Sequence, residues 1–236
     1  MWWSCFTWYE KGPYYIWEEE TAEEKKAAKK DLAERNKAVW QDSYIKWLSE
    51  GPLGFRLRIS DTQIGGVQPR FRYTKATGAF VRKDGAGGID WYRYQMKIIK
   101  GKLIPFYNRL MRRYGFAVVV EDNASSHASH YNVQLWELLE IARMEWPSNS
   151  PDLNAIEPTW FWMKRETTKT GPITSTEELK AAWIKCWGEM PQEKIQAWIE
   201  RIPRHIQEVI KCEGGNLYEE GRLKGQEKKR VHDSFN

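Results

Sequence analysis

The chain has 236 residues, a formal charge of +5 and 41% hydrophobic residues, which is enough to bury the core of one large domain and excludes a disordered protein, tails aside. Apolar runs fall short of the roughly 20 residues that a membrane span needs. The start, MWWSCFTWY, lacks the basic segment and cleavage site of a signal peptide, so we expect an intracellular protein without membrane contact. Cys5, Cys186 and Cys212 lack metal-ligand spacing, which predicts reduced thiols.

Positive charge is concentrated in one third of the chain. Between Gly51 and Arg113 there are 14 Lys and Arg residues and three acids, a local charge of +11 that leaves −6 for the remainder. Lysine and arginine gain affinity for nucleic acid by releasing the counterions condensed on phosphates, although the same pattern also fits a solvated surface without a partner. The candidate nucleic-acid contacts are Arg70, Arg72, Lys75, Arg82 and Lys83.

The first predicted elements are a β-hairpin and a charged helix. Aromatic runs at Met1–Tyr9 and Pro13–Trp17, separated by Glu-Lys-Gly, predict the hairpin. The helix is expected from about Thr21 to Ser49, with an apolar stripe of Trp40, Tyr44, Trp47 and Leu48. The Gly-rich basic segment from Gly51 to Gly88 has no sustained periodicity and predicts a long, functional loop.

A second helix and a buried strand are expected next. The predicted helix, Ile89 to about Arg113, carries a core-facing stripe at three- and four-residue steps: Ile89, Tyr92, Met96, Ile99, Leu103, Phe106 and Leu110. The continuous apolar run Phe116–Val120 predicts a strand buried on both faces. A short helix at His130–Ile141 and a strand around Ala142–Trp146 should follow.

The remaining elements are expected to be helical. The turn PSNSPD precedes a predicted helix from Leu153 to about Thr168, and two further helices follow Gly171-Pro172. The last, Gln192–Cys212, should pack through Ile195, Trp198, Ile199, Ile202, Ile206 and Val209 and be kinked at Pro203.

Two acids stand where chemistry is expected. Asp122 follows the valine run, and active sites of open α/β sheets collect at such strand ends, although an acid there can also simply cap a turn. Glu157 is expected as the fifth residue of its helix, beside the buried face, where a metal ion would offset the cost of a bare carboxylate. The alternative for Glu157 is a solvated acid that interacts with the positive helix end.

The surroundings of these acids favour the functional interpretation. Asp122 and Glu157 are separated by 34 residues, and their flanks read EDNASSH and WPSNSPDLNAIEPTWFWMKRE. This combination resembles the DD34E signature of the Tc1/mariner DDE transposases. The segments WSCFTWYEKGP, GGIDWYRYQ and GGNLYEEGR are similar to fungal members of the group, so that the resemblance covers nearly the whole chain.

The resemblance implies an α/β fold with an RNase H-like mixed sheet flanked by helices. It also implies a two-metal Mg²⁺ or Mn²⁺ site for phosphodiester cleavage and strand transfer. Asp122 would be the second acid and Glu157 the third, with Asn123 and His127 in supporting roles, while Asp152 and Asn154 would shape the loop and cap the helix. DNA, both transposon ends and target, is the implied partner in the nucleus; a homodimer is compatible, and no small-molecule cofactor is implied.

The family places its first acid on a strand upstream of the hairpin. We therefore expect residues 1–170 to form a partial catalytic domain that lacks this central strand, followed by a helical extension at 171–213 and a basic tail at 214–236. Such a chain should be inactive alone. The alternative function is a non-catalytic nucleic-acid-binding remnant or domesticated protein, and a decayed gene fragment is a third reading.

Overall fold

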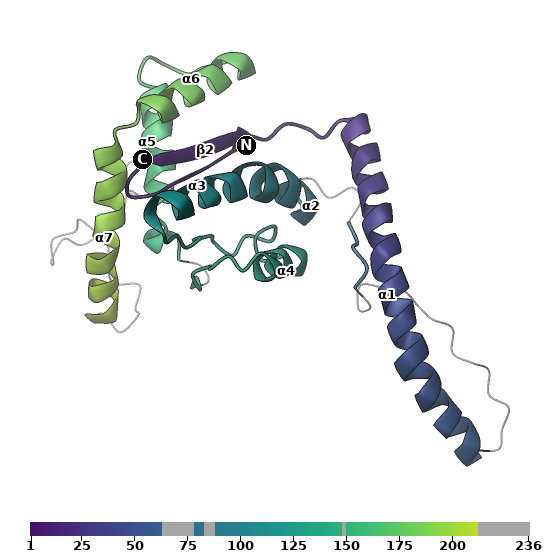
Figure 1. The fold of residues 1–236 in the computed structure, drawn as a ribbon. Helices are drawn as coiled ribbons and strands as arrows, with labels where there is room; N and C mark the ends of the chain where they lie inside the picture. Colours follow the sequence, from purple (N-terminus) through teal and green to yellow (C-terminus); the bar gives the residue numbers. More distant parts are fainter. Residues whose placement is uncertain (63–77, 83–87, 148–149, 212–236) are drawn as a thin grey trace, which may run out of the picture. The chain divides into compact units, whose positions relative to one another are not determined.

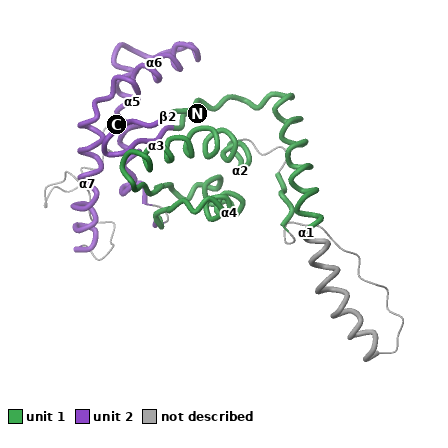
Figure 2. The backbone as a smooth tube through the Cα atoms, viewed as in Figure 1, with its two compact units in different colours: residues 1–3, 14–146 green, residues 4–13, 147–236 purple. Residues whose placement is uncertain are grey.

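The computed structural model describes residues 1–62, 78–82, 88–147 and 150–211, without the side chains of residues 43–62. The chain forms two compact units (Figure 2). Unit 1 comprises Met1–Trp3 and Tyr14–Trp146, and unit 2 comprises Ser4–Pro13 and Pro147–Asn236. The domain predicted at residues 1–170 therefore includes parts of both units, and the predicted tail at 214–236 lies outside the described residues.

The predicted hairpin is confirmed, with its turn displaced. Strands β1 (Trp2–Phe6) and β2 (Lys11–Ile16) form a two-stranded sheet (Figure 1). The turn lies at Thr7–Glu10, where the Thr7 amide donates to the Glu10 carbonyl at 2.8 Å and the Thr7 hydroxyl accepts from the Glu10 amide at 3.1 Å. A threonine hydroxyl that accepts from the turn amides favours this position over the Glu-Lys-Gly turn at residues 10–12 expected from the sequence.

Helix α1 (Ala22–Thr62) is longer than predicted. It begins at a capping box in which the Thr21 hydroxyl accepts from the Glu24 amide and the Glu24 carboxylate accepts from the Thr21 amide, both at 3.1 Å. The loop predicted from Gly51 is therefore wrong for residues 51–62, because the helix continues past Gly51. Among the described side chains of this helix, Ala28 and Leu32 are buried, whereas Trp40 of the predicted stripe is 40% exposed. The stripe residues Tyr44, Trp47 and Leu48 lie outside the described side chains.

The second predicted helix is present as three consecutive segments: α2 (Trp91–Arg93), the π-helix η2 (Tyr94–Leu103) and α3 (Ile104–Tyr114). Its predicted stripe is confirmed at Tyr92, Ile99, Leu103, Phe106 and Leu110, which are all buried. Pro105 explains the wider turn, because its ring lacks an amide hydrogen and would clash with the carbonyl four residues earlier in an α-helix. In the π register the Ile104 amide donates to the Ile99 carbonyl.

In place of the two strands predicted at Phe116–Val120 and around Ala142–Trp146, the structure has a single parallel β-bridge between Val119 and Arg143. The Val119 amide donates to the Ala142 carbonyl, and the Met144 amide donates to the Val119 carbonyl, both at 2.9 Å. Val119 is buried, but Phe116 is 72% and Val120 47% exposed. The expectation of a strand buried on both faces at Phe116–Val120 is therefore wrong, because this run has one paired edge in the described structure.

Helix α4 (His130–Leu138) completes the core of unit 1. That core is a cluster of Ala28, Leu32, Trp91, Tyr92 and Tyr131. Asn132 is fully buried and its amide donates to the Trp91 carbonyl at 3.2 Å and to the Ser126 carbonyl at 2.7 Å. These bonds join α4 both to α2 and to the loop that follows Asp122.

The regular elements in the described part of unit 2 are helices, apart from the hairpin tip. It contains the short 3-10 helix η3 (Pro151–Leu153) and the helices α5 (Glu157–Thr167), α6 (Thr176–Glu189) and α7 (Gln192–Lys211). Lys11 at the hairpin tip donates to the carbonyls of Trp187 at 3.0 Å and Met190 at 2.7 Å, satisfying acceptors at the end of α6. Of the residues expected to pack α7, Ile195 is buried whereas Ile206 is 40% exposed.

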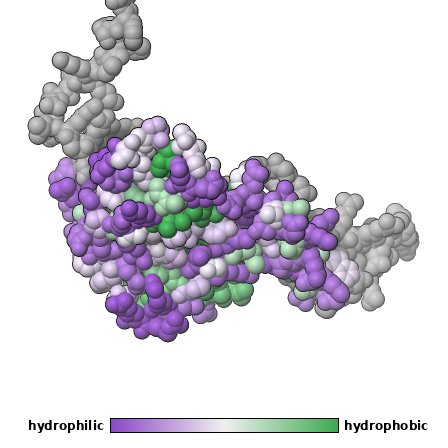
Figure 3. All heavy atoms as spheres, turned by 90° about the horizontal axis from the view of Figure 1, so that it is seen from above, coloured by the Kyte–Doolittle hydropathy of each residue, from purple (hydrophilic) through white to green (hydrophobic). Residues whose placement is uncertain are grey.

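These elements confirm an α/β protein with a small sheet and helical flanks. Seen from one side, the described surface is mostly hydrophilic with small hydrophobic areas (Figure 3). None of the described helices combines the length and apolar character that crossing a membrane requires.

Candidate acidic site

Asp122 lies just beyond the bridged residue Val119, in a turn that fixes its carboxylate. Its Oδ1 accepts from the Ala124 amide at 3.0 Å and lies 2.6 Å from Nδ1 of His127. The side chain is 45% exposed, so solvent reaches the carboxylate. In the sequence, His127 was assigned a role near Asp122 only because of the family resemblance. The structure shows a direct contact between the two side chains.

His127 is held against Asp122 by packing as well as charge. Its ring lies 4.4 Å from that of Tyr94, and its side chain is 17% exposed. Burial lowers the pKa of His127, but the hydrogen bond to Asp122 and the negative charge of Glu121 raise it more. The same hydrogen bond lowers the pKa of Asp122 despite the opposing effect of its burial.

A second carboxylate, that of Glu121, lies buried next to the Asp122–His127 pair, and the sequence analysis did not identify it. Glu121 is only 5% exposed, accepts a short hydrogen bond from the Tyr94 hydroxyl, and lies 3.3 Å from Nη2 of Arg143. Tyr94 therefore contacts both Glu121 and His127. Glu121 could have been identified from the sequence, because it is an acid that directly follows the apolar run Phe116–Val120 and precedes Asp122.

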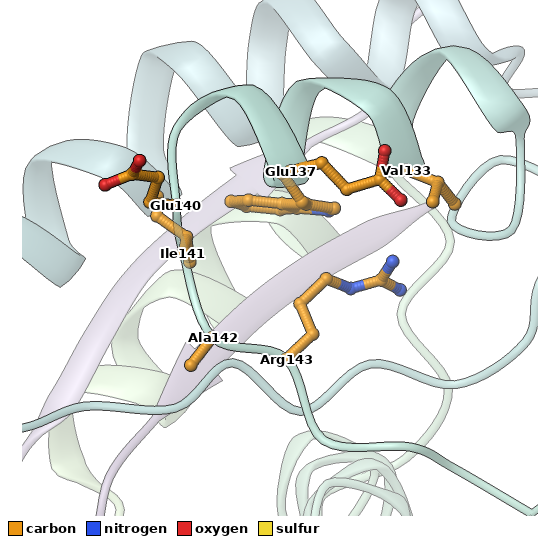
Figure 4. A pocket seen from close by; sticks show the side chains of 7 residues that line it. Val133, Glu137, Glu140, Ile141, Ala142 and Arg143 are labelled. Carbon is orange, nitrogen blue, oxygen red and sulfur yellow. The ribbon is translucent and has the colours of Figure 1, made fainter.

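Asn123 and the Arg143 segment complete the surroundings. The Asn123 amide donates to the Trp146 carbonyl at 2.9 Å, which ties the turn to the segment bridged with Val119. A hollow of about 400 Å³ lies beside Arg143 and is lined by residues of α4 and the following turn (Figure 4). Arg143 lines this hollow, whereas Asp122 does not.

Glu157 belongs to unit 2, where it is the first residue of α5 rather than the fifth, as the sequence had predicted. Its amide donates to the Asn154 carbonyl at 3.0 Å, and the Asn154 side chain accepts from the Ile156 amide at 3.3 Å. The helix therefore starts later because Asn154 forms a turn. A carboxylate at this position interacts favourably with the positive end of α5.

Asp152 has a different role from the helix cap expected for it. Its Oδ2 lies 2.7 Å from Nε2 of His205 in α7, whose side chain is 7% exposed. Asp152 thus connects η3 to α7 within unit 2. Asn154 alone has the predicted turn-forming role.

Arg82 is the described member of the predicted nucleic-acid contacts, and the structure gives it another role. Its guanidinium binds Glu20 at 2.6 and 2.8 Å and Asp90 at 2.6 Å, and the side chain is 14% exposed. A guanidinium that is bound to two carboxylates stabilises the fold, and a phosphate contact by Arg82 stays a prediction. The other predicted contacts, Arg70, Arg72, Lys75 and Lys83, lie outside the described residues.

The donor chemistry of the two acids fits a hard divalent cation. Mg²⁺ is commonly held by one or two carboxylates together with water and phosphate oxygens. Asp122 offers a solvent-accessible carboxylate, and Glu157 offers one at a helix start. Within the described ranges, no three His, Cys, Asp or Glu side chains gather closely enough to hold an ion by themselves.

The sequence around these two acids is similar to that of a known protein family. The profile of a family described as DDE superfamily endonuclease matches residues 86–180, a range that includes both Asp122 and Glu157. The Tcb1 transposase of Caenorhabditis briggsae is 30% identical over 129 residues, covering 54% of this chain and 45% of that protein. The Tc3 transposase of Caenorhabditis elegans is 26% identical over 129 residues, covering 53% and 37%.

The chain thus spans less than half of the length of these curated relatives. Among solved structures, the catalytic domain of Mos1 mariner transposase is similar with a TM-score of 0.46 and 19% identity, covering 56% of this chain and 65% of that one. The family match agrees with the RNase H-like class expected from the sequence. Residues 86–180 match the family described as DDE superfamily endonuclease, and the chain is similar to the Tc1/mariner transposases.

Proposed function

We propose that this protein contributes Asp122 and Glu157 to a divalent-metal site for phosphodiester cleavage and strand transfer at transposon DNA ends, acting in the nucleus. The observation that supports this most directly is the family match over residues 86–180, which includes both acids. The curated relatives are named transposases, and one solved structure is described as a Mos1 transposase paired-end complex with the left transposon end. Paired ends would bring two copies of the chain together.

The described side chains suggest how Asp122 is prepared for such a site. The Ala124 amide and His127 both hold Oδ1, so the carboxylate has a fixed orientation before any ligand arrives. The contacts of Glu121 with Tyr94 and Arg143 hold the residue that precedes Asp122 in place. Mg²⁺ or Mn²⁺, when bound, would activate the attacking oxygen and stabilise the leaving oxygen.

Metal binding is the first test. Mn²⁺ titration followed by electron paramagnetic resonance should show binding to the wild-type chain that weakens in Asp122→Asn and in Glu157→Gln. Asp152→Asn is the matched control, because its carboxylate binds His205 and should leave Mn²⁺ affinity unchanged. Equal Mn²⁺ binding by wild type and both acid variants would refute the metal site.

DNA assays separate the enzyme from its alternative, a non-catalytic nucleic-acid-binding protein. Nicking of terminal-repeat DNA that depends on Mn²⁺ and on both acids would support the enzyme, and it would contradict the expectation that these 236 residues are inactive alone. Affinity for DNA measured against salt should be unchanged in Asp122→Asn and Glu157→Gln if the chain only binds, since phosphate contacts come from cations.

A further inference from the structure

A groove on unit 2 combines aromatic rings with positive charge. It lies between α5 and α7, has a volume of about 380 Å³, and is lined by Pro158, Phe161, Trp162, Arg165, Lys194 and Trp198. No carboxylate is among these lining residues. The groove is therefore aromatic and cationic without a built-in counter-charge.

Helical spacing places these side chains next to one another. On α5, Phe161 and Arg165 are four residues apart and share a face, and Glu157 lies one further turn towards the start of that helix. On α7, Lys194 and Trp198 have the same four-residue spacing. The groove thus runs along the helix that carries the proposed metal ligand.

The exposure of Phe161 is unusual for packing alone. Its side chain is 71% exposed, although it sits beside two tryptophans that are partly buried. Arg165 and Lys194 are also exposed, and neither has a carboxylate partner among the described residues. An exposed ring in the same groove as two cations matches the surfaces on which bases stack while cations contact the phosphates of a single strand.

We propose that the groove between α5 and α7 binds an unpaired segment of DNA, with a base stacked on Phe161 and phosphates contacted by Arg165 and Lys194. This rests on the proposed function, since it assigns a role in holding DNA to the face of α5 that follows Glu157. The cations provide charge complementarity, and the ring provides a contact that a phosphate backbone alone would not use.

Binding of a fluorescein-labelled oligothymidylate by the full chain tests the proposal. Phe161→Ala should weaken binding roughly 5- to 150-fold, the range that the loss of one base stack produces. An abasic oligonucleotide of the same length should bind wild type and Phe161→Ala alike. Phe116→Ala is the matched control, because Phe116 is 72% exposed on unit 1 and lies outside the groove.

Charge is tested separately. Lys194→Ala should lower the slope of log affinity against log salt by about 0.7 for a single strand, the value for one lost phosphate contact. Lys185→Ala, an exposed α6 lysine beside Glu189, should leave the slope unchanged. A matching slope in wild type and Lys194→Ala would contradict the phosphate contact.

Cross-linking gives a measurement that does not depend on a folded variant. DNA containing 5-iodouracil should cross-link to wild-type Phe161, Trp162 or Trp198 under ultraviolet light, whereas cross-links confined to other regions would overturn the proposal. Equal oligothymidylate affinity in Phe161→Ala and Phe116→Ala would overturn it as well. Mn²⁺ binding by Asp122 and Glu157 would survive these outcomes, so the two proposals fail independently.

Discussion

The carboxylate of Asp122 and the imidazole of His127 are 2.6 Å apart, and the Tyr94 ring packs against the imidazole at a tilt of 40°. The carboxylate and imidazole favour each other's charged form, because each supplies the opposite charge. The pair therefore behaves as an ion pair within unit 1, and its strength depends on pH.

Replacing the carboxylate should change the titration of the histidine. In Asp122→Asn, the pKa of His127 should fall, because the variant loses the hydrogen bond and the negative charge that raise this pKa against burial. Nuclear magnetic resonance of the His127 ring protons measures the change directly. An unchanged or higher pKa in the variant would show that Asp122 does not bind His127 in solution.

The pair should also stabilise the fold over a limited pH range. Because folding raises the pKa of His127, this residue stabilises the fold fully below about pH 6.5, its ordinary pKa, and the effect is lost as pH rises through the folded-state pKa. Because folding lowers the pKa of Asp122, its contribution is present above about pH 3.8 and is lost as pH falls through the folded-state pKa. His127→Asn should therefore lower the free energy of unfolding by about 1 kcal/mol near pH 5.5 and by less near pH 9, given the half-exposed carboxylate. Urea denaturation at both pH values decides this, and a larger loss at high pH would contradict it.

Arg82 should contribute more to stability than an ordinary surface cation. Arg82→Met leaves the carboxylates of Glu20 and Asp90 facing each other without their partner, at side-chain exposures of 12% and 24%. We expect the free energy of unfolding to fall by about 1 to 3 kcal/mol, below the full value for a deeply buried pair because these groups retain some solvent. Lys185→Met is the control, since Lys185 and Glu189 are 74% and 66% exposed and should change stability by less than about 0.5 kcal/mol.

Replacing two glycines by alanine should change the free energy of unfolding in opposite directions. Gly115 ends α3 with a φ of 73°, so Gly115→Ala should lower the free energy of unfolding by about 1 kcal/mol although its surroundings are open. Gly188 lies inside α6 in open space without a positive φ, so Gly188→Ala should raise it by about 0.5 to 1 kcal/mol. Thermal unfolding of both variants provides the comparison, and a shift of the same sign in both would contradict the assignment of these helix positions.

Cys186 should be a slow nucleophile. Burial, followed by the nearby charges of Glu166 and Glu189, raises its pKa to about 11, so that at pH 8 about one molecule in a thousand carries the thiolate. Alkylation by iodoacetamide, followed by peptide mass spectrometry, should therefore be about 100-fold slower at Cys186 in the folded chain than in the urea-unfolded chain. Equal rates in the two states would show that the thiol is accessible and not shifted.

Local patterns predicted the elements whose residues interact over short distances. The two aromatic runs of the hairpin and the stripe through Ile99, Phe106 and Leu110 depend on neighbours along the chain, and the structure confirms both elements. The capping turn at Asn154 moved the start of α5 to Glu157, a difference that a helical stripe alone does not reveal.

Contacts between distant segments were less accessible to sequence reasoning. The interactions of Arg82 with Glu20 and of Asp152 with His205 join residues more than fifty positions apart, so no spacing rule identifies them. Val119 has the composition of a buried strand, yet pairing depends on which segments lie beside it, and the structure supplies one bridge to Arg143. The basic residues outside the described ranges keep their assignment as predictions.

The wide turn before Pro105 has an evolutionary consequence. A π-helical turn holds one more residue than an α turn, so deleting one position between Tyr94 and Leu103 would shorten the chain while returning the helix to the ordinary register. Related sequences that align with a one-residue gap here would therefore retain both flanking helical faces, provided that they also lack the proline.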